Sequence, residues 1–426
     1  MKLLSCLTLL SAFALACGGA VDSTNDAGTQ SGDDAGQPTV DASPTPDSSV
    51  VDVSVPDAGF PGPHPAVPQV QDYGGPVLTA PTAIPIFFQN DSEQSKVEDF
   101  MNQLAASSFW PSATKEYGAG PLTIGQSIVV TDTPPTTTTV AEIEQWLAGY
   151  LDGTHPEWPA IAQNNIYTVF FPSTTTIDDP NFGTSCVSFG GYHYEAKGPG
   201  GKSIVYAVMP RCSSLGQVVQ GFDALTAGLS HELIEASTDP LASNPAWSYV
   251  DLDHMVWNLM PLGEIGDMCA YEPQSYQRLV GAYMVQRPWS NASALAGHDP
   301  CVPVLGDPYF NAAPVLNDSI TIDYYGQNVT TKGVQVPLGK SKTIDVQLFS
   351  DGPTQDWTVQ AVDETYGTNQ SAQLTFSWDS QSGNNGDVKH LTITRVANGT
   401  HAGTEMLLYA QRGLTTANMW FGFVGN

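Results

Sequence analysis

Residues 230–240 read Ser-His-Glu-Leu-Ile-Glu-Ala-Ser-Thr-Asp-Pro, and this run decides how the domain around it is built. Its apolar positions recur at helical spacing, and Pro240 ends the run because a proline disfavours helical backbone at the residue before it. We therefore predict one long helix over residues 216–239. At about 100° per residue, one stripe of this helix is apolar and should be buried. That stripe consists of Phe222, Leu225, Leu229, Leu233 and Ala236.

The opposite face of the helix carries His231 and Glu235, four residues apart. Two ligands at this spacing can point at one metal ion, and the glutamate after the first ligand can reach a water on that ion. The pattern predicts a zinc site with His231 and Glu235 as ligands and Glu232 as general base. Small neighbours should leave the space above the pair open, namely Ala224, Ala227 and Gly228.

Glu235 stands where the usual zinc-peptidase helix has a second histidine. A carboxylate can bind zinc, but the extra negative charge leaves a bound water less acidic. Two other interpretations therefore stay open. One is a helix with an exposed polar face and no metal, and the other is a calcium site, since the candidate ligands are rich in oxygen.

Further motifs accompany the helix in a fixed order. Downstream of it lie Ala246-Trp247, Glu-Ile-Gly-Asp-Met-Cys at 264–269, Tyr-Met-Val-Gln at 283–286, Trp289 and Cys301. Upstream lie Gly-Gly-Pro-Val-Leu at 74–78, Asn-Ile-Tyr at 165–167, Cys186, Gly-Tyr-His-Tyr at 191–194, and Tyr206-Ala207 before Cys212. Over residues 74–301 the chain resembles the exordium or phosphate-induced protein family, whose members are mostly secreted plant cell-wall proteins with a suggested zincin-like character.

This resemblance implies a zincin-like α/β (α+β) domain but not a role in growth. The glycine-rich stretch that family members carry after the Glu-Ile-Gly-Asp-x-Cys motif is absent here. For a third metal ligand we rank Glu264 first, because it resembles the distal glutamate of many zincins. Asp267 ranks second and could instead orient His231. Asp239 fits a helix-ending role better, and His193 fits a packed or hydrogen-bonded histidine better.

Two folded domains follow from the pattern of strands and helices. Residues 70–308 alternate apolar strands (83–88, 165–171 and 203–209) with amphipathic helices (91–106 and 140–151), which predicts a mixed α/β domain. From residue 309 to 426 the pattern changes to seven short strands separated by turns, which predicts an all-β, immunoglobulin-like sandwich.

The N-terminus carries export signals. Residues 1–16 have one charge at Lys2, a short apolar run and a small residue before a cysteine, as in a signal peptide. Residues 17–69 are mostly an acidic, flexible linker, so we expect a lipid on Cys17, although ordinary signal cleavage also fits. The expected location is outside the cytoplasmic membrane, at the outer membrane or cell surface, or secreted, with the lipid as the one membrane contact.

Four cysteines remain beyond the export signal, and an oxidising compartment favours disulfides between them. Neighbours in sequence close the shortest loops, which favours Cys186 with Cys212 and Cys269 with Cys301. The second bond would hold the loop of Glu264 and Asp267 against the domain.

The net charge of the protein limits the classes of partner that it can bind. With 14 basic against 43 acidic residues the net charge is -29, which disfavours nucleic acid. The leading hypothesis is a zinc-dependent surface peptidase acting on a peptide or a cell-wall or surface polymer. The alternative is a non-catalytic protein that binds cell-wall glycans on the same scaffold.

Overall fold

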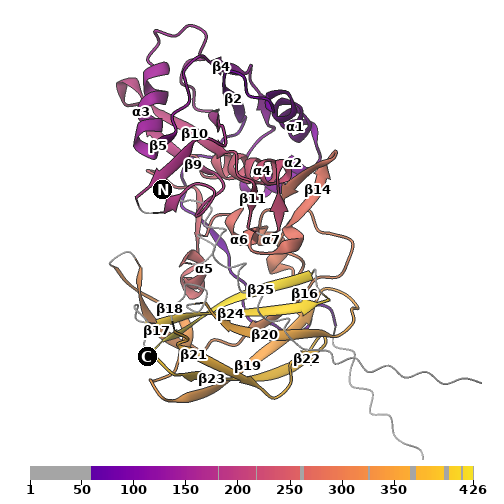
Figure 1. The fold of residues 1–426 in the computed structure, drawn as a ribbon. Helices are drawn as coiled ribbons and strands as arrows, with labels where there is room; N and C mark the ends of the chain where they lie inside the picture. Colours follow the sequence, from indigo (N-terminus) through magenta and orange to yellow (C-terminus); the bar gives the residue numbers. More distant parts are fainter. Residues whose placement is uncertain are drawn as a thin grey trace, which may run out of the picture.

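The computed structural model describes residues 59–426 except 181, 217, 260–262, 325–326, 365–370, 398–402, 414–415 and 426. The predicted signal peptide, Cys17 and the linker up to residue 58 lie outside the described residues. Figure 1 shows an α/β region of residues 70–308 stacked end to end on a β-rich region of residues 309–426. We call these the N-terminal and C-terminal regions.

The N-terminal region is built on a sheet whose central strands are the three predicted apolar runs. These are β2 (Thr82–Phe88), β6 (Asn165–Phe171) and β10 (Ser203–Pro210), which pair in parallel. The sheet order is β3-β2-β6-β10-β9, in which β9 (Tyr192–Lys197) runs antiparallel to β10. At the other edge, β3 (Thr123–Ile124) and β4 (Ile128–Val130) both pair with β2. The prediction of a mixed α/β domain is confirmed.

Helices cover both faces of this sheet, which explains why its strands are apolar along their whole length. Alternate strand residues such as Ile86, Val169 and Val208 pack with α3 (Val140–Tyr150), which begins at a capping box between Thr139 and Glu142. The other set packs with α1 (Gln94–Ala106), α2 (Phe109–Thr114) and α4 (Phe222–Thr238).

Helix α4 begins six residues later than predicted, so the predicted start is wrong. Instead, β11 (Ser214–Leu215) and β12 (Val219–Gln220) pair with each other in antiparallel fashion. Gly216 and Gly221 take positive φ values of 55° and 59°, which turn the chain and prevent a continuous helix. The helix period cannot reveal this, because glycine is compatible with either backbone.

The predicted open space above His231 and Glu235 is also wrong, since α4 is buried from Ala224 to Thr238 on all sides. Gly228 allows close packing there: a Cβ on it would lie 3.3 Å from the methyl of Met209 on β10 and 3.6 Å from Leu215 on β11. The small residues on this face of α4 therefore allow the β11–β12 hairpin and the sheet to pack closely against the helix.

Smaller elements close the N-terminal region. Strands β1 (Val70–Asp72) and β13 (Trp247–Val250) pair with each other, as do strands β14 (Tyr276–Val280) and β15 (Tyr283–Gln286). A third small sheet consists of β5 (Thr137–Thr139), β7 (Thr176–Asp179) and β8 (Gly183–Thr184). Short helices follow α4, namely α5 (Val256–Leu259), α6 (Asp267–Ala270) and α7 (Asn291–Leu295).

The C-terminal region is β-rich and almost wholly antiparallel, which confirms the prediction of an all-β region. One sheet has the order β16-β19-β23-β21 and the other β17-β18-β25-β24-β20-β22, with β18 and β25 parallel to each other. The seven predicted strands all occur, and β16, β18 and β22 are additional. The strands are β16 (Phe310–Pro314), β17 (Asp318–Tyr324), β18 (Gln327–Gln335), β19 (Ser341–Ser350), β20 (Trp357–Asp363), β21 (Leu374–Trp378), β22 (Ser382–Gly383), β23 (Val388–Arg395), β24 (Gly403–Arg412) and β25 (Thr416–Gly425).

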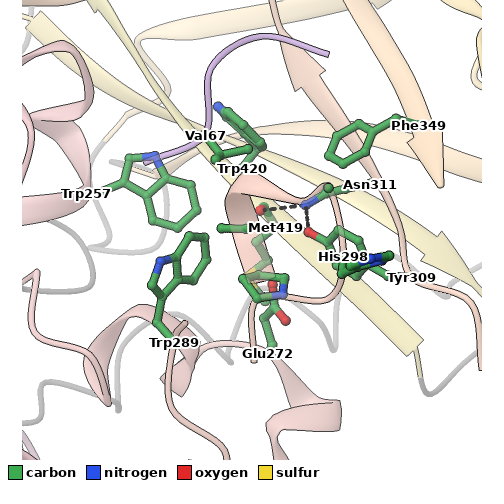
Figure 2. A pocket seen from close by; sticks show the side chains of 13 residues that line it. Val67, Trp257, Glu272, Trp289, His298, Tyr309, Asn311, Phe349, Met419 and Trp420 are labelled. Atoms are coloured by element: carbon green, nitrogen blue, oxygen red, sulfur yellow. Dashed lines mark hydrogen bonds between the residues drawn. The ribbon is translucent and has the colours of Figure 1, made fainter. Parts of the chain in front are cut away.

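The two regions share an aromatic contact. Trp257 on α5 packs edge-on against Trp420 and Phe421 of β25, with ring centroids 6.0 and 4.8 Å apart. Figure 2 shows Trp257, Trp289 and Trp420 close together, with the Glu272 side chain near them. Residues 59–69, predicted as linker, also contact the C-terminal region: the Gly62 amide donates to Asn385 Oδ1 at 2.8 Å.

Both predicted disulfides are confirmed, Cys186–Cys212 and Cys269–Cys301. They indicate an oxidising, extracytoplasmic setting. Among the described residues, no helix combines the length and apolar character needed to cross a membrane.

Candidate metal centre

Four separate elements bring polar side chains to one buried place beside α4. The helix supplies His231, Glu232 and Glu235, and β9 supplies His193 from the edge of the sheet. The turn before α6 supplies Glu264, the first residue of α6 is Asp267, and β15 supplies Gln286. These seven residues are at most 5% exposed.

The first half of the cluster lies around His231. Its Nε2 is 2.9 Å from Glu235 Oε2 and 3.6 Å from Asp267 Oδ1. On the other side of the ring, Nδ1 lies 3.1 Å from Gln286 Oε1. The Gln286 amide nitrogen donates to the Gly266 carbonyl at 2.6 Å, so its oxygen faces the histidine. His231 Nδ1–H therefore donates to Gln286, and Nε2 is left for Glu235, Asp267 or an ion.

The second half lies around His193. Its Nδ1 is 3.3 Å from Glu232 Oε2 and 3.6 Å from Glu235 Oε2. Its Nε2 is 3.6 Å from Glu264 Oε2. Glu235 therefore contacts both histidines through the same oxygen, Oε2.

The other oxygen of Glu235 fixes the loop that carries the acidic residues. The backbone N–H groups of Gly266 and Asp267 both donate to Glu235 Oε1 at 3.0 Å. Gly266 is required for this approach, because a Cβ on it would lie 2.7 Å from His231 Nδ1 and 2.8 Å from Glu235 Oε1. The Cys269–Cys301 bond holds the end of the same segment.

Charge interactions dominate the protonation of this cluster. Burial alone would lower the pKa of His193, but Glu264, Glu232 and Glu235 raise that pKa to about 9. Burial likewise opposes the charged form of His231, and Glu235 raises its pKa to about 8. For Glu235, burial acts to raise the pKa, but the two histidines and the Asp267 amide hold it well below its usual range.

The residues present fit a bound cation. The cluster contains four carboxyl groups (Glu232, Glu235, Glu264 and Asp267) and two imidazoles, all buried. If all four carboxyl groups are ionised, even two imidazolium ions leave two negative charges in a site shielded from water, which is costly. Moreover, Glu232 Oε1 is buried and has no hydrogen-bond partner among the described residues. A divalent cation would reduce the negative charge and could take the Glu232 oxygen as a ligand, and two subsets of these side chains have ligand atoms close enough to hold one.

A pocket connects this cluster with the surface. Its volume is about 110 Å³, and His193 and Glu264 are among the residues that line it. The wall includes Tyr249, which takes a φ of 55°, uncommon for a residue with a side chain. A small part of a substrate could therefore reach the cluster beside His193.

The structure places the predicted residues as follows. His231, Glu235 and Asp267 lie together, whereas Glu264 contacts His193. Asp239 lies outside the cluster, at the end of α4, where its Oδ1 accepts from the Ala246 amide at 2.7 Å. No pattern in the sequence links Gln286 to His231. His193 was expected to be a packed or hydrogen-bonded histidine, because local sequence does not show that a strand residue contacts a distant helix.

Comparisons with known proteins give no family for this chain. Neither the models of known protein families nor the curated proteins yield a match. Two crystal structures of a beta-glucosidase from Listeria innocua, one with isofagomine bound, share 10% and 8% identity, with TM-scores of 0.16 and 0.15. The alignments cover 84% of this chain, which spans 48% of each of those chains. Similarities this weak carry no argument about fold or function.

Proposed function

We propose that this protein is an extracytoplasmic, metal-dependent hydrolase of peptide-like substrates, with its active centre at α4. One observation carries the proposal: His231 Nε2, Glu235 Oε2 and Asp267 Oδ1 converge in a buried place. Burial and mutual closeness of one imidazole and two carboxylates favour an ion over a set of salt bridges. The zincin-like character implied by the resemblance to exordium proteins supports the same proposal.

The side chains have distinct roles in it. His231 and Glu235 hold the ion, and Asp267 is the third ligand by its distance, with Glu264 directed at His193 instead. The histidine nitrogen favours zinc over calcium, which prefers oxygen ligands alone. A bound zinc ion would supply a Lewis acid to polarise a substrate carbonyl. Glu232 supplies the proton acceptor through Oε1, which has no hydrogen-bond partner among the residues that the structure describes.

The substrate class follows from charge and access. A net charge of -29 opposes polyanions, and the pocket beside His193 combines Tyr194, Pro245 and Tyr249 with the carboxyl groups of Asp239 and Glu264, which also disfavours an anionic substrate. We propose a peptide or the peptide part of a surface polymer. In this proposal Cys17 carries the lipid anchor, and the C-terminal region is an immunoglobulin-like sandwich that positions the enzyme or binds the polymer.

Metal analysis tests the proposal most directly. Purified protein should contain zinc, and His231→Ala should lower its zinc content. His155→Ala is the matched control, because His155 is 39% exposed and distant from these contacts, and it should leave zinc unchanged. Protein without zinc, or equal zinc in both variants, would end the proposal.

Hydrolysis of denatured protein substrates and of peptidoglycan fragments tests the role of Glu232. Glu232→Gln should lower the rate at least about 100-fold, since a positioned proton acceptor typically contributes 10²- to 10⁴-fold. The control Glu157→Gln changes an exposed carboxyl and should retain full activity. Equal activity in the two variants would remove Glu232 from the mechanism.

A further inference from the structure

We infer that the centre holds two divalent cations, with Glu235 between them, and not a single zinc ion. The first position consists of His231, Glu235 and Asp267, and the second of His193, Glu232 and Glu235. The inference rests on the proposed function in that it assigns a second ion to the same site, and it makes Glu232 a ligand of that ion in place of the proton acceptor of the single-ion proposal.

The ligand atoms divide into two sets. Within each set the three atoms lie within 4.8 Å of one another, and all the residues are buried. The two sets have only Glu235 in common, and each contains one histidine. Two histidines that served the same ion would be expected in one set.

Each histidine has its own outer partner, as metal-binding histidines generally do. His231 presents Nε2 to its set, and its Nδ1 is held by Gln286 Oε1 at 3.1 Å. His193 presents Nδ1 to its set, and its Nε2 faces Glu264 Oε2 at 3.6 Å. These contacts orient both rings toward the shared carboxylate of Glu235. A site with one histidine ligand would require such an outer partner for only one ring.

Glu235 is placed to serve both positions. Two backbone N–H groups occupy its Oε1, at 3.0 Å each, which fixes the carboxylate plane. The remaining oxygen, Oε2, is the one that contacts both rings, at 2.9 Å from His231 Nε2 and 3.6 Å from His193 Nδ1. A bridging carboxylate is the usual way for two ions to share one site.

The number of buried carboxyl groups is compatible with a second ion. The four carboxylates carry four negative charges when ionised, and neutral imidazoles add none. One divalent ion leaves two negative charges buried, whereas two such ions leave none.

Glu232 provides an independent sign of the second position. This residue is 1% exposed, and within the part of the chain that the structure describes its Oε1 has no hydrogen-bond partner. Gly191 lies directly against it, since a Cβ there would be 3.1 Å from Oε1, so the carboxylate is confined beside His193. An unpaired, confined carboxylate oxygen next to an imidazole is suited to a cation.

The test is the metal stoichiometry of the full chain, measured after removal of metal by a chelator, reloading with zinc and gel filtration in salt. The wild type should retain two equivalents by mass spectrometry. His193→Ala and His231→Ala should each retain one, and His155→Ala two. Glu232→Gln, which keeps the shape of the side chain, should also retain one and covers the case in which a histidine variant fails to fold.

A parallel measurement uses Co²⁺, because two adjacent ions that share a carboxylate couple magnetically. The electron paramagnetic resonance signal per cobalt should be weaker in the wild type than in His193→Ala. A wild type that binds one equivalent, or two equivalents retained in His193→Ala and Glu232→Gln, overturns the second ion but leaves the proposed function intact. A wild type that binds none overturns both.

Discussion

Substitution of Gly266 by alanine should disrupt the candidate metal centre although the backbone itself tolerates alanine. Gly266 has φ -72° and ψ -44°, an ordinary helical conformation. Alanine there would by itself stabilise the protein by about 0.4–1 kcal/mol, because it restricts the unfolded chain. The added Cβ, however, would lie 2.7 Å from His231 Nδ1 and 2.8 Å from Glu235 Oε1.

The contacts of this loop set the magnitude. These distances are shorter than real Cβ contacts, so either the loop or the two side chains must move, and overpacking of this kind costs about 1–3 kcal/mol. The movement also weakens two hydrogen bonds from the loop amides to Glu235, each of which contributes about 1.5–3 kcal/mol when the acceptor is charged. If the two hydrogen bonds lose about half of their contribution, we expect a net loss of about 2–5 kcal/mol and a melting temperature lower by on the order of 10 °C. Zinc affinity should fall by about 10- to 100-fold, as for other changes behind metal ligands.

Thermal unfolding and a zinc competition titration measure these effects. Gly149→Ala is the matched control, because Gly149 lies in α3 and a Cβ on it would have no atom within 4 Å. This control should be neutral or more stable by up to about 1 kcal/mol. The reasoning is refuted if Gly266→Ala melts and binds zinc like the wild type, or if Gly149→Ala lowers both values equally.

Two further predictions concern the surroundings of the centre. Burial and then the charge of Asp299 raise the pKa of Glu272 from 4.5 to about 8, so the folded protein keeps a proton that the unfolded chain releases. The free energy of unfolding should therefore fall as the pH rises between these values. In Glu272→Gln this decrease should be smaller, as measured by thermal unfolding across the same pH range. The same pH dependence in the variant and the wild type would contradict the prediction. The Cys269–Cys301 bond closes a loop with a sequence separation of 32, which corresponds to about 3–4 kcal/mol. Replacing both cysteines by serine should lower stability by that order and speed zinc release to a chelator, whereas an unchanged release rate would separate the bond from the site.

Local sequence was sufficient for the strands and for the pairing of the cysteines. The three central strands of the N-terminal sheet were predicted because strands buried on both faces are apolar throughout. The disulfides were predicted because neighbouring cysteines close the shortest loops. The start of α4 was not predicted correctly, because Gly216 and Gly221 are compatible with a helix in sequence but adopt positive φ in the fold.

His231 and Glu235 are neighbours for a local reason: helix geometry alone places residues four apart on one face. The other members of the cluster depend on long-range packing. His193 reaches Glu232 across 39 residues because β9 lies antiparallel on the edge of the sheet beside α4, and Gln286 reaches His231 across 55 residues. Sequence spacing therefore determined the helical half of the centre. Only the tertiary structure decided which acidic residue and which second histidine join it, since strand order and loop packing arise from contacts between parts of the chain that no local pattern connects.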